Sequence, residues 1–512
     1  MPNKRKKNSS KGKVYLIGAG PGDPGLLTLR GASLLAQAEV VVYDRLVNPA
    51  LLELAPHGEK IYAGKNIHGD STTSLDQKRI NALLVQKAAA GKRVVRLKGG
   101  DPFIFGRGGD EALFLKNKKI PFEVVPGVSA GSAVPAYAGI PVTDRSLASL
   151  VTFVTSHEDP SKKKQSAVNW QKLASIGGTL VCFMGLETLP RTVKLLLQGG
   201  KPAQTPVAVI ERGTLPSQRV VEGTLSTIVR KVRRLRMEPP ALTVIGDVAR
   251  LRKKLAWFEK KPLAGKTVLV TRAAADAATL RQALEQQGAR VLEYPAIKIL
   301  PPLDSGPLDR ALQNISQFDW IVFTSANGVE HVFHRLRALG KDVRIFSNIK
   351  IAAIGHATDE TLQTRGLKAD LVPEVFTSES LVEKLAGTKQ VRGRKFLLPR
   401  TDIAPEFLTR RLQMLGGEVT EVVAYRTVAP SKEKEKLKNW IEKESIDFVT
   451  FSSSSTVRNF FEALPKNRRS RLKSRFVSIG PVTSQELKRF GYQPYREAHP
   501  HTVRGLIDVL TG

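Results

Sequence analysis

The chain has little cysteine, no long apolar run and comparatively few acidic residues. Its 512 residues include one cysteine, Cys182, which lies inside the apolar run "TLVCFMGL" and has no partner for an intrachain disulfide. A free thiol in such a run indicates a core residue and a reducing compartment. No apolar run approaches the ~20 residues of a membrane-spanning helix. The start, "MPNKRKKNSSKGK", lacks the apolar segment of a secretory signal. We therefore expect a cytoplasmic protein without a membrane segment, in which residues 1–13 form a basic tail.

The shortage of acidic residues leaves a formal net charge of +33, from 80 basic and 47 acidic side chains. Such a charge can serve to bind nucleic acid through a basic face or to attract a small polyanionic substrate. It can also serve only to keep the protein soluble. No zinc-finger spacing, RNA-binding signature or basic patch interleaved with aromatics occurs. The basic clusters are scattered, at 4–7, 162–164, 230–236, 252–254 and 468–469. This scatter argues against nucleic acid as a partner.

The length is too great for a single core, so several domains are expected. Short β-rich runs alternate with helical patterns throughout, which is typical of α/β domains with parallel sheets and crossover helices. The charged segment "RLRKKLAWFEKKPLAGK" (250–266) precedes a fresh strand, "TVLVTR". We expect domains at 14–250 and 265–512, joined by a linker at 251–264.

The second domain repeats itself. "FDWIVFTSANGVEHVFHRL" matches "IDFVTFSSSSTVRNFFEAL", and "IAAIGHATDETLQTRGL" matches "FVSIGPVTSQELKRFGY". Arg272 and Arg400 lie 128 positions apart in a third matching pair of segments, and Asp319 and Asp447 are also 128 apart. Matching segments in the same order at one spacing predict two homologous α/β lobes. Two such lobes can form a cleft for a ligand.

Residues 14–25, "VYLIGAGPGDPG", consist of a β-type apolar run followed by a segment with four glycines and two prolines. No Gly-Lys-Ser/Thr follows, and the spacing does not fit a dinucleotide fingerprint. The pattern predicts a strand, a tight turn and a helix beginning near Leu26. Pro21 and Pro24 withdraw amide donors, which suits a ligand that is not anionic at this point. A glycine-rich turn without a ligand is the alternative.

Two further glycine clusters follow apolar runs, "RVVRLKGGDPFIFGRGGDE" (93–111) and "VVPGVSAGSAVPAYAGIPVTDR" (124–145). Three such strand ends can converge at the carboxyl edge of one open sheet, where ligands bind in these folds. Backbone carbonyls and a carboxylate such as Asp101 suit a cationic ligand better than a phosphate.

These segments, with "VVYDRLV", "CFMGL", "PVAVIERGT" and "TVIGDV", resemble uroporphyrinogen-III C-methyltransferases of the tetrapyrrole methylase family over residues 14–250. The resemblance implies two α/β subdomains, a homodimer, and S-adenosylmethionine bound between the subdomains, with no metal. It implies contacts to this methyl donor from the turn residues and from the second subdomain: Pro21, Gly99, Gly100, Asp101, Ile104, Ser129, Ala130, Met184 and Gly213. For Met184, an apolar core position is the alternative.

The resemblance also implies two catalytic groups, Asp44 as proton acceptor and Lys65 as proton donor. Such groups are needed because a pyrrole carbon attacks the methyl group and the cationic adduct must then lose a proton. Asp44 could instead pair with an arginine and only position the substrate, and Lys65 could instead clamp a substrate carboxylate. This chain has Thr143-Asp144-Arg145 where the family commonly has Thr-His-Arg, and the loop at Asn66–His68 is altered.

Residues 265–512 resemble uroporphyrinogen-III synthases through "VLVTR", "FTSANGV", "AAIGHAT", "AYRTV" and "FVSIGPVTS". The resemblance implies one lobe from 265–299 with 428–512 and another from 300–427. It also implies closure of hydroxymethylbilane with inversion of the last ring, for which folding the substrate is the main task. Hydroxyls and amides at strand ends or helix starts can hold substrate carboxylates, or can simply cap helices: Ser325, Asn327, Thr358, Ser452, Ser453 and Thr483. Tyr425 is expected to assist hydroxyl departure, the alternative being a strand residue between the lobes.

Together the resemblances imply a bifunctional enzyme that makes uroporphyrinogen III and methylates it twice to precorrin-2, toward sirohaem or cobalamin. The family's substrates carry eight carboxylates, and the +33 charge is consistent with attracting them. A methylase of another tetrapyrrole and an RNA-binding methyltransferase are the alternatives.

Overall fold

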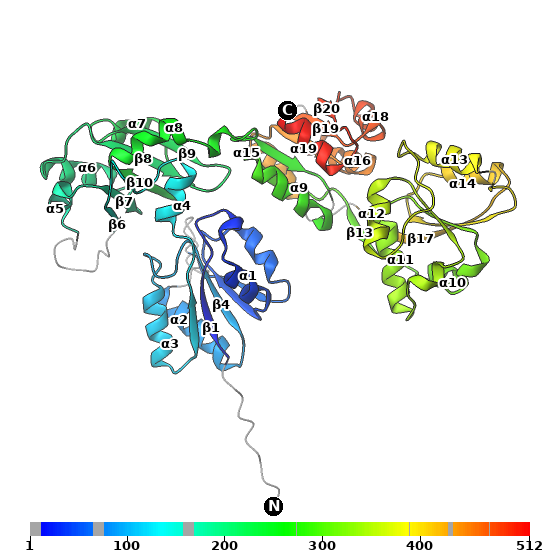
Figure 1. The fold of residues 1–512 in the computed structure, drawn as a ribbon, viewed down its shortest axis with the longest axis horizontal. Coiled ribbons are helices and arrows are strands. Elements are labelled where there is room, and N and C mark those ends of the chain that lie inside the picture. Colours follow the sequence, from blue (N-terminus) through cyan, green and yellow to red (C-terminus); the bar gives the residue numbers. More distant parts are fainter. Residues whose placement is uncertain are drawn as a thin grey trace, which may run out of the picture. The chain divides into compact units, whose positions relative to one another are not determined.

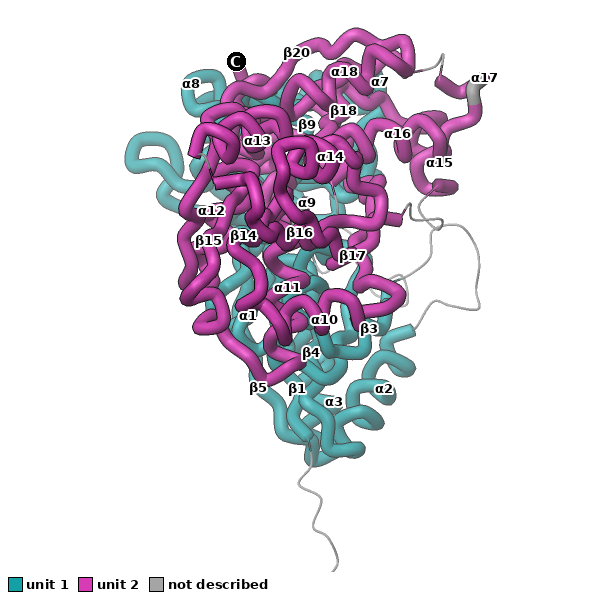
Figure 2. Tube along the Cα trace, turned by 90° about the vertical axis from the view of Figure 1, so that its right-hand side faces the viewer, with its two compact units in different colours: residues 1–265 teal, residues 266–512 magenta. Residues whose placement is uncertain are grey.

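The computed structural model describes residues 12–64, 76–156, 168–272, 274–388, 390–428, 434–469 and 472–512. Lys65, expected to donate a proton, lies outside these residues, as do Asn66 and His68. The chain divides into two compact units, residues 1–265 and 266–512 (Figure 2). In the described segments, no helix combines the length and apolar content that crossing a membrane requires.

The first sheet of unit 1 is parallel throughout, with strand order β3-β2-β4-β1-β5. Its elements are β1 (Val14–Gly18), α1 (Leu29–Ala36), β2 (Val40–Tyr43), β3 (Glu59–Tyr62), α2 (Gln77–Ala89), β4 (Val94–Lys98), α3 (Gly108–Asn117), β5 (Phe122–Val125) and α4 (Ala130–Tyr137). Figure 1 shows its strands β1 and β4 between helix α1 on one side and helices α2 and α3 on the other. Leu16 packs in the cluster that contains Leu84 of α2, whereas Ile17 packs in the cluster that contains Leu35 of α1. The strands are apolar without alternation because both faces of this sheet are covered.

The helix expected near Leu26 begins later. Residues Pro24–Leu26 form a single 3-10 turn capped by Asp23, and α1 begins at Leu29 with Thr28 as its N-cap. The side chain of Thr28 accepts a hydrogen bond from the amide of Gly31, which satisfies one free donor of the first turn.

The second sheet of unit 1 has strand order β6-β7-β10-β8-β9 and is mixed, not parallel. Its elements are β6 (Val151–Thr155), α5 (Trp170–Ser175), β7 (Thr179–Phe183), α6 (Leu189–Gln198), β8 (Pro206–Glu211), β9 (Arg219–Thr224), α7 (Ile228–Arg234) and β10 (Ala241–Ile245). The short connection 212–218 leaves no room for a crossover helix, so β8 and β9 pair antiparallel. Cys182 lies in the core of this sheet, as the sequence predicts, and burial raises the pKa of its thiol to about 12.

Residues 251–264, expected to be a linker, fold onto unit 1 and include α8 (Arg252–Leu255). The indole Nε1 of Trp257 donates to the carbonyl of Ala136 at 3.0 Å, and the ring of Phe258 packs 5.0 Å from that of Tyr137. Phe258 is buried. Charged residues of the segment dock as well, since Arg252 donates to the carbonyl of Ala138 and Glu259 accepts from Gln218. The charged composition therefore did not indicate an exposed linker.

Unit 2 contains the third sheet, which is parallel and has strand order β12-β11-β18-β19-β20. Its elements are β11 (Thr267–Val270), α9 (Ala274–Gln286), β12 (Arg290–Glu293), α15 (Lys434–Lys443), β18 (Phe448–Phe451), α16 (Ser454–Ala463), α17 (Lys466–Arg469), β19 (Arg475–Ser478), α18 (Pro481–Arg489), β20 (Arg496–Glu497) and α19 (Val503–Thr511). The sheet draws its strands from the two ends of the unit.

The fourth sheet, also in unit 2, has strand order β13-β17-β16-β14-β15, and only the β13–β17 pair is antiparallel. Its elements are β13 (Lys298–Leu300), α10 (Gly306–Gln313), β14 (Trp320–Phe323), α11 (Ala326–Ala338), β15 (Lys350–Ala353), α12 (His356–Thr364), α13 (Ser378–Gly387), β16 (Lys395–Thr401), α14 (Phe407–Met414) and β17 (Glu418–Val428). Strand β13 lies at the expected division between the lobes, at residue 299, and pairs with β17.

The sequence repeat corresponds to a repeated structural device. Asp319 accepts a hydrogen bond from the amide of Lys395 at 2.8 Å, which ties the start of β14 to the start of β16. Asp447 accepts one from the amide of Thr267 at 2.9 Å, which ties the start of β18 to the start of β11 in the same way. A basic residue just before the neighbouring strand, Arg394 or Lys266, pairs with each carboxylate.

Candidate active sites

Three glycine turns meet at the carboxyl edge of the first sheet because β1 lies between β4 and β5. Gly20 and Gly100 exchange backbone hydrogen bonds of 3.2 and 2.7 Å. A Cβ atom on Gly127 would lie 2.3 Å from the carbonyl oxygen of Gly100 and 2.6 Å from Cα of Gly18. The glycines are therefore required in part by backbone-on-backbone packing, whatever ligand the turns hold.

Asp101 joins the second and third turns. One carboxylate oxygen accepts from the amide of Phe103 at 2.8 Å, and the other accepts from the amide of Gly127 at 3.0 Å. The third turn then leads into α4, whose N-cap is Ser129 and whose first residue is Ala130. Asp101 is thus committed to backbone contacts that hold the turns together.

The first turn also contacts the loop between β8 and β9 of the second sheet. The amide of Asp23 donates to Oγ1 of Thr214 at 3.1 Å, and a Cβ on Gly22 would lie 2.9 Å from the side chains of Thr214 and Leu215. A Cβ on Gly213 would lie 2.3 Å from the side chain of Val134 in α4. Pro21 and Gly213 are far apart in the sequence, but the loops to which they belong are in contact.

Met184 follows β7 and is 52% exposed, with a left-handed φ of 52°. It is therefore not a core residue. The preceding residue, Phe183, packs 4.9 Å from the ring of Phe105, which belongs to the second turn together with the half-buried Ile104. Exposed apolar side chains, Met184, Phe103 and Phe105, accompany the glycine turns.

These features fit a methyl donor such as S-adenosylmethionine. The turns present bare backbone at Gly99 and Gly100, and Gly100 has the left-handed φ of 68° that favours glycine. The exposed apolar side chains suit an adenosine, and the scarcity of basic side chains in the turns suits a sulfonium cation. In the described part of the chain, no group of three His, Cys, Asp or Glu side chains could hold a metal ion.

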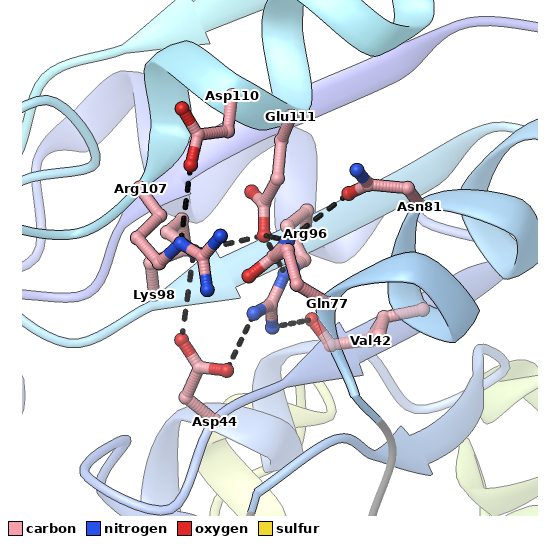
Figure 3. Close-up of polar contacts among 9 residues, drawn as sticks. All are labelled: Val42, Asp44, Gln77, Asn81, Arg96, Lys98, Arg107, Asp110 and Glu111. Carbon is pink, nitrogen blue, oxygen red and sulfur yellow. Dashed lines mark hydrogen bonds and ion pairs between the residues drawn. The ribbon is translucent and has the colours of Figure 1, made fainter. Parts of the chain in front are cut away.

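Asp44 lies directly after β2 and belongs to a network of charges (Figure 3). An arginine partner for Asp44 was one of the two alternatives considered from the sequence, whereas Lys98 and Glu111 were not foreseen. Nη2 of Arg96 donates to Oδ1 of Asp44 at 2.5 Å, and Nζ of Lys98 lies 3.8 Å from Oδ2. Behind them Glu111 accepts from Nε of Arg96 at 3.1 Å and from Nζ of Lys98 at 3.0 Å. The available signal was "RLK" at the end of an apolar strand, because two basic residues in a buried strand need buried partners.

Asp144, at the departure from the family motif, closes a local turn. Its Oδ1 accepts from the amide and hydroxyl of Ser146 and from the amide of Leu147. These hydrogen bonds lower the pKa of the Asp144 carboxyl.

In the fourth sheet, residues predicted to bind substrate gather at the carboxyl ends of adjacent strands. Ser325 caps α11 after β14 through the amide of Gly328, and Asn327 lies in the first turn of α11. Thr358 is buried in the first turn of α12 after β15. The hydroxyls of Ser325 and Tyr425 are 2.9 Å apart, so β17 contributes to the same place.

Two neighbours of Tyr425 were not foreseen. The ring of His331 stacks against Tyr425 with centroids 5.6 Å apart, and the charge of buried Arg400 favours the phenolate. Burial outweighs Arg400 and raises the pKa of Tyr425, so its hydroxyl stays protonated and can donate. Burial also lowers the pKa of His331.

In the third sheet Ser453 and Thr483 occupy positions equivalent to those of Ser325 and Thr358 in the fourth. Ser453 caps α16 in a capping box with Thr456, and Ser452 precedes it after β18. Thr483 is buried in the first turn of α18, after β19. The hydroxyls of Ser325 and Ser453 thus accept hydrogen bonds as helix N-caps, whereas the half-buried Asn327 and Ser452 have no cap role.

Comparison with known proteins assigns each unit to a family. A family model described as tetrapyrrole (corrin/porphyrin) methylases matches residues 13–229, and one described as uroporphyrinogen-III synthase HemD matches residues 278–508. A porphyrin biosynthesis protein HemD from Ruminiclostridium josui is 37% identical over 500 residues, covering 98% of this chain and 97% of that protein.

Of two further relatives, one matches about half of this chain and the other matches most of it. An S-adenosyl-L-methionine-dependent uroporphyrinogen III methyltransferase from Methanosarcina barkeri is 53% identical over 241 residues, 47% of this chain and 93% of that protein. A uroporphyrinogen-III C-methyltransferase from Bacillus subtilis is 42% identical over 431 residues, 82% of this chain and 86% of that protein.

Proposed function

Because this chain belongs to the tetrapyrrole methylase family through its first unit and to the uroporphyrinogen-III synthase family through its second, we propose that it catalyses two successive steps. The second unit closes hydroxymethylbilane to uroporphyrinogen III. The first unit methylates uroporphyrinogen III twice to precorrin-2, on the route to sirohaem or cobalamin. One observation carries this proposal: the two family matches, 13–229 and 278–508, each fall inside one compact unit.

In the first unit, the glycine turns and the loop at Gly213 bind the methyl donor. Bound S-adenosylmethionine supplies an electrophilic methyl group on a positively charged sulfur. Its transfer to a pyrrole carbon of the substrate would leave a cationic macrocycle that must lose a proton. Asp44, 30% exposed at the end of β2, accepts that proton, and Lys65 serves as proton donor.

In the second unit, binding groups outnumber catalytic ones because the reactive cation forms readily and the unit must prevent simple closure. Ser325, Asn327 and Thr358 bind substrate carboxylates at one sheet edge, and Ser452, Ser453 and Thr483 bind them at the other. The protonated hydroxyl of Tyr425 donates to the departing hydroxyl group, which leaves as water.

We further propose that the chain forms a homodimer through the first unit, as the family resemblance implies, and that it works in the cytoplasm. The buried free thiol of Cys182 is consistent with a reducing compartment. Light scattering of the purified chain measures the mass of the assembly, and a monomer at micromolar concentration contradicts the dimer.

The test uses the full chain with hydroxymethylbilane. Without S-adenosylmethionine we expect uroporphyrinogen III, and with it the absorbance of precorrin-2. Accumulation of the isomer formed without ring inversion would show that the second unit lacks synthase activity. Supplying uroporphyrinogen III directly tests the first unit alone. A different tetrapyrrole or RNA, added as a competitor that would slow precorrin-2 formation, tests the two alternative substrates.

A matched variant separates the two reactions within one chain. Asp44→Asn should slow precorrin-2 formation about 100-fold, while uroporphyrinogen III is still formed at the rate of the unmodified chain. Loss of both products would point instead to a folding defect.

A further inference from the structure

Arg96 and Lys98 are charged side chains in the middle of the first sheet, where burial of a charge is costly. They are 2% and 3% exposed, and they alternate with Leu97, so both point to the same face of β4. Glu111 of α3, on that face, is fully buried. A strand that needed only to fill the core would carry apolar residues at both positions.

The two cations each connect Glu111 to Asp44. Oε1 of Glu111 receives Arg96 Nε, Lys98 Nζ and Gln77 Nε2 at 3.0–3.1 Å. On the opposite side, Arg96 reaches Oδ1 of Asp44 and Lys98 lies near Oδ2 (Figure 3). Each oxygen of the Asp44 carboxylate thus has its own cation, which opposes rotation of the carboxylate about its Cβ–Cγ bond.

The charges of this cluster balance at two cations and two carboxylates. Burial by itself disfavours the charged forms, but the charges of Glu111 and Asp44 outweigh it and raise the pKa of Arg96. The charges of Arg96 and Lys98 likewise outweigh burial and lower the pKa of Glu111. At Lys98 burial and the charge of Arg96 prevail over the two carboxylates and lower its pKa. Oε2 of Glu111 is buried without a hydrogen-bond partner. Buried ion pairs of this kind add little stability compared with apolar residues of similar size, which suggests a role beyond stability.

Asp44 is the exposed end of the cluster, with 30% of its side chain accessible. The segment that follows Asp44 contacts the donor-binding turns: a Cβ on Gly99 would lie 3.0 Å from Cβ of Leu46, and Asn48 donates to the carbonyl of Gly22 at 2.8 Å. The buried cluster therefore ends in one accessible carboxylate beside the proposed site of methyl transfer.

We propose that Arg96 and Lys98, held in place by Glu111, are positioning residues that orient the Asp44 carboxylate to receive the proton lost from the methylated macrocycle. In this step the ring carbon keeps its new bond to the methyl group, a carbon–hydrogen bond of the macrocycle breaks, and its proton passes to an oxygen of Asp44. The inference rests on the proposed function of the first unit and on the role of Asp44.

The test is a double-mutant cycle in the full chain, assayed with uroporphyrinogen III and S-adenosylmethionine. Asp44→Asn should lower kcat about 100-fold, and Lys98→Met should lower it at least about 10-fold through misplacement of the carboxylate. KM for uroporphyrinogen III and the Kd of the donor should change less than about twofold. Because Lys98 acts through Asp44, the double variant should be no slower than Asp44→Asn alone.

The conservative variant and a matched control complete the design. Lys98→Arg, which keeps the positive charge beside Asp44, should recover most of kcat. Lys13→Met is the control, because Lys13 and Arg30 pair with the single carboxylate of Glu123 in the same arrangement at the surface. It should leave kcat unchanged. If Lys98→Met does not fold, as judged by circular dichroism and donor binding, Lys98→Gln retains a polar group of similar length and takes its place in the cycle.

Each outcome has a distinct meaning. If the unmodified chain does not methylate uroporphyrinogen III, the proposed function is wrong. If it does but Asp44→Asn is as fast, Asp44 is not the proton acceptor and the positioning role falls with it. If Asp44→Asn is slow but Lys98→Met has the original kcat, or if the two losses multiply in the double variant, the inference alone is overturned.

Discussion

Tyr425 is a residue whose surroundings suit chemistry better than they suit packing. Its ring is buried in the core of the fourth sheet, yet its hydroxyl lies 2.9 Å from that of Ser325 and its face stacks on His331. "AYRT" in the sequence identified the tyrosine, but nothing in the sequence placed Ser325, a hundred positions earlier, beside it.

We expect Tyr425→Phe to slow ring closure of hydroxymethylbilane at least about tenfold, because no acid then assists departure of the hydroxyl group. The lost hydrogen bond should cost about 1 kcal/mol of stability. Rapid assay of uroporphyrinogen III formation and urea unfolding measure the two effects.

Tyr495→Phe is the control, since that hydroxyl accepts from Arg475 near the surface of the third sheet and should not affect the rate. Closure at the original rate in Tyr425→Phe would favour the other reading of Tyr425, a strand residue without a catalytic role.

At the scale of elements, the three glycine turns depend on contact between backbones. We expect Gly127→Ala to destabilise unit 1 by about 2 kcal/mol, because its Cβ would meet the carbonyl of Gly100 at 2.3 Å and backbone cannot yield as a side chain can. Donor binding, measured by calorimetry, should weaken as well. Gly109→Ala places a methyl group where no atom lies within 4 Å and should change neither quantity. Equal behaviour of the two variants would contradict this account of the turns.

The repeated aspartates give a pH dependence at the same scale. The hydrogen bond from the amide of Lys395, joined by Arg394, lowers the pKa of Asp319 below its ordinary value of 3.8. A carboxylate whose pKa is lower in the folded chain contributes stability that is complete above the unfolded pKa and is lost as the pH falls through the folded pKa. The contribution should therefore be present at pH 5 and be lost as the pH falls below 3.8 through the lower pKa of the folded chain.

Asp319→Asn should lower the free energy of unfolding at pH 5 by about 1–2 kcal/mol, and the difference from the unmodified chain should shrink as the pH falls. Urea unfolding at several pH values measures it. Asp342→Asn should have a smaller effect, because Asp342 contacts Arg344 within its own turn and joins no two strands. A pH-independent loss in Asp319→Asn would rule out the ionised carboxylate as the cause.

At the scale of the whole molecule, each unit has its own sheets and its own cores. We therefore expect calorimetry of the full chain to show more than one unfolding transition. S-adenosylmethionine at about 100 times its Kd should stabilise the transition of unit 1 by about 2.7 kcal/mol, or roughly 5 °C or more, without moving that of unit 2. Gly127→Ala identifies the transition of unit 1 independently. A donor-induced shift confined to the other transition would contradict the assignment of the binding site.

The sequence by itself determined the α/β class, the two families, the duplication in the second half and the convergence of the glycine turns. These follow from local patterns and from spacing, which a chain carries whether or not it is folded. The structure alone decided that the second sheet is mixed, that residues 251–264 dock on unit 1, and that Arg96 and Lys98 contact both Asp44 and Glu111. The physical reason is that such contacts join residues distant in the chain: Asp44 and Arg96 are 52 positions apart, and periodicity shows which side chains are buried but not which partners they meet.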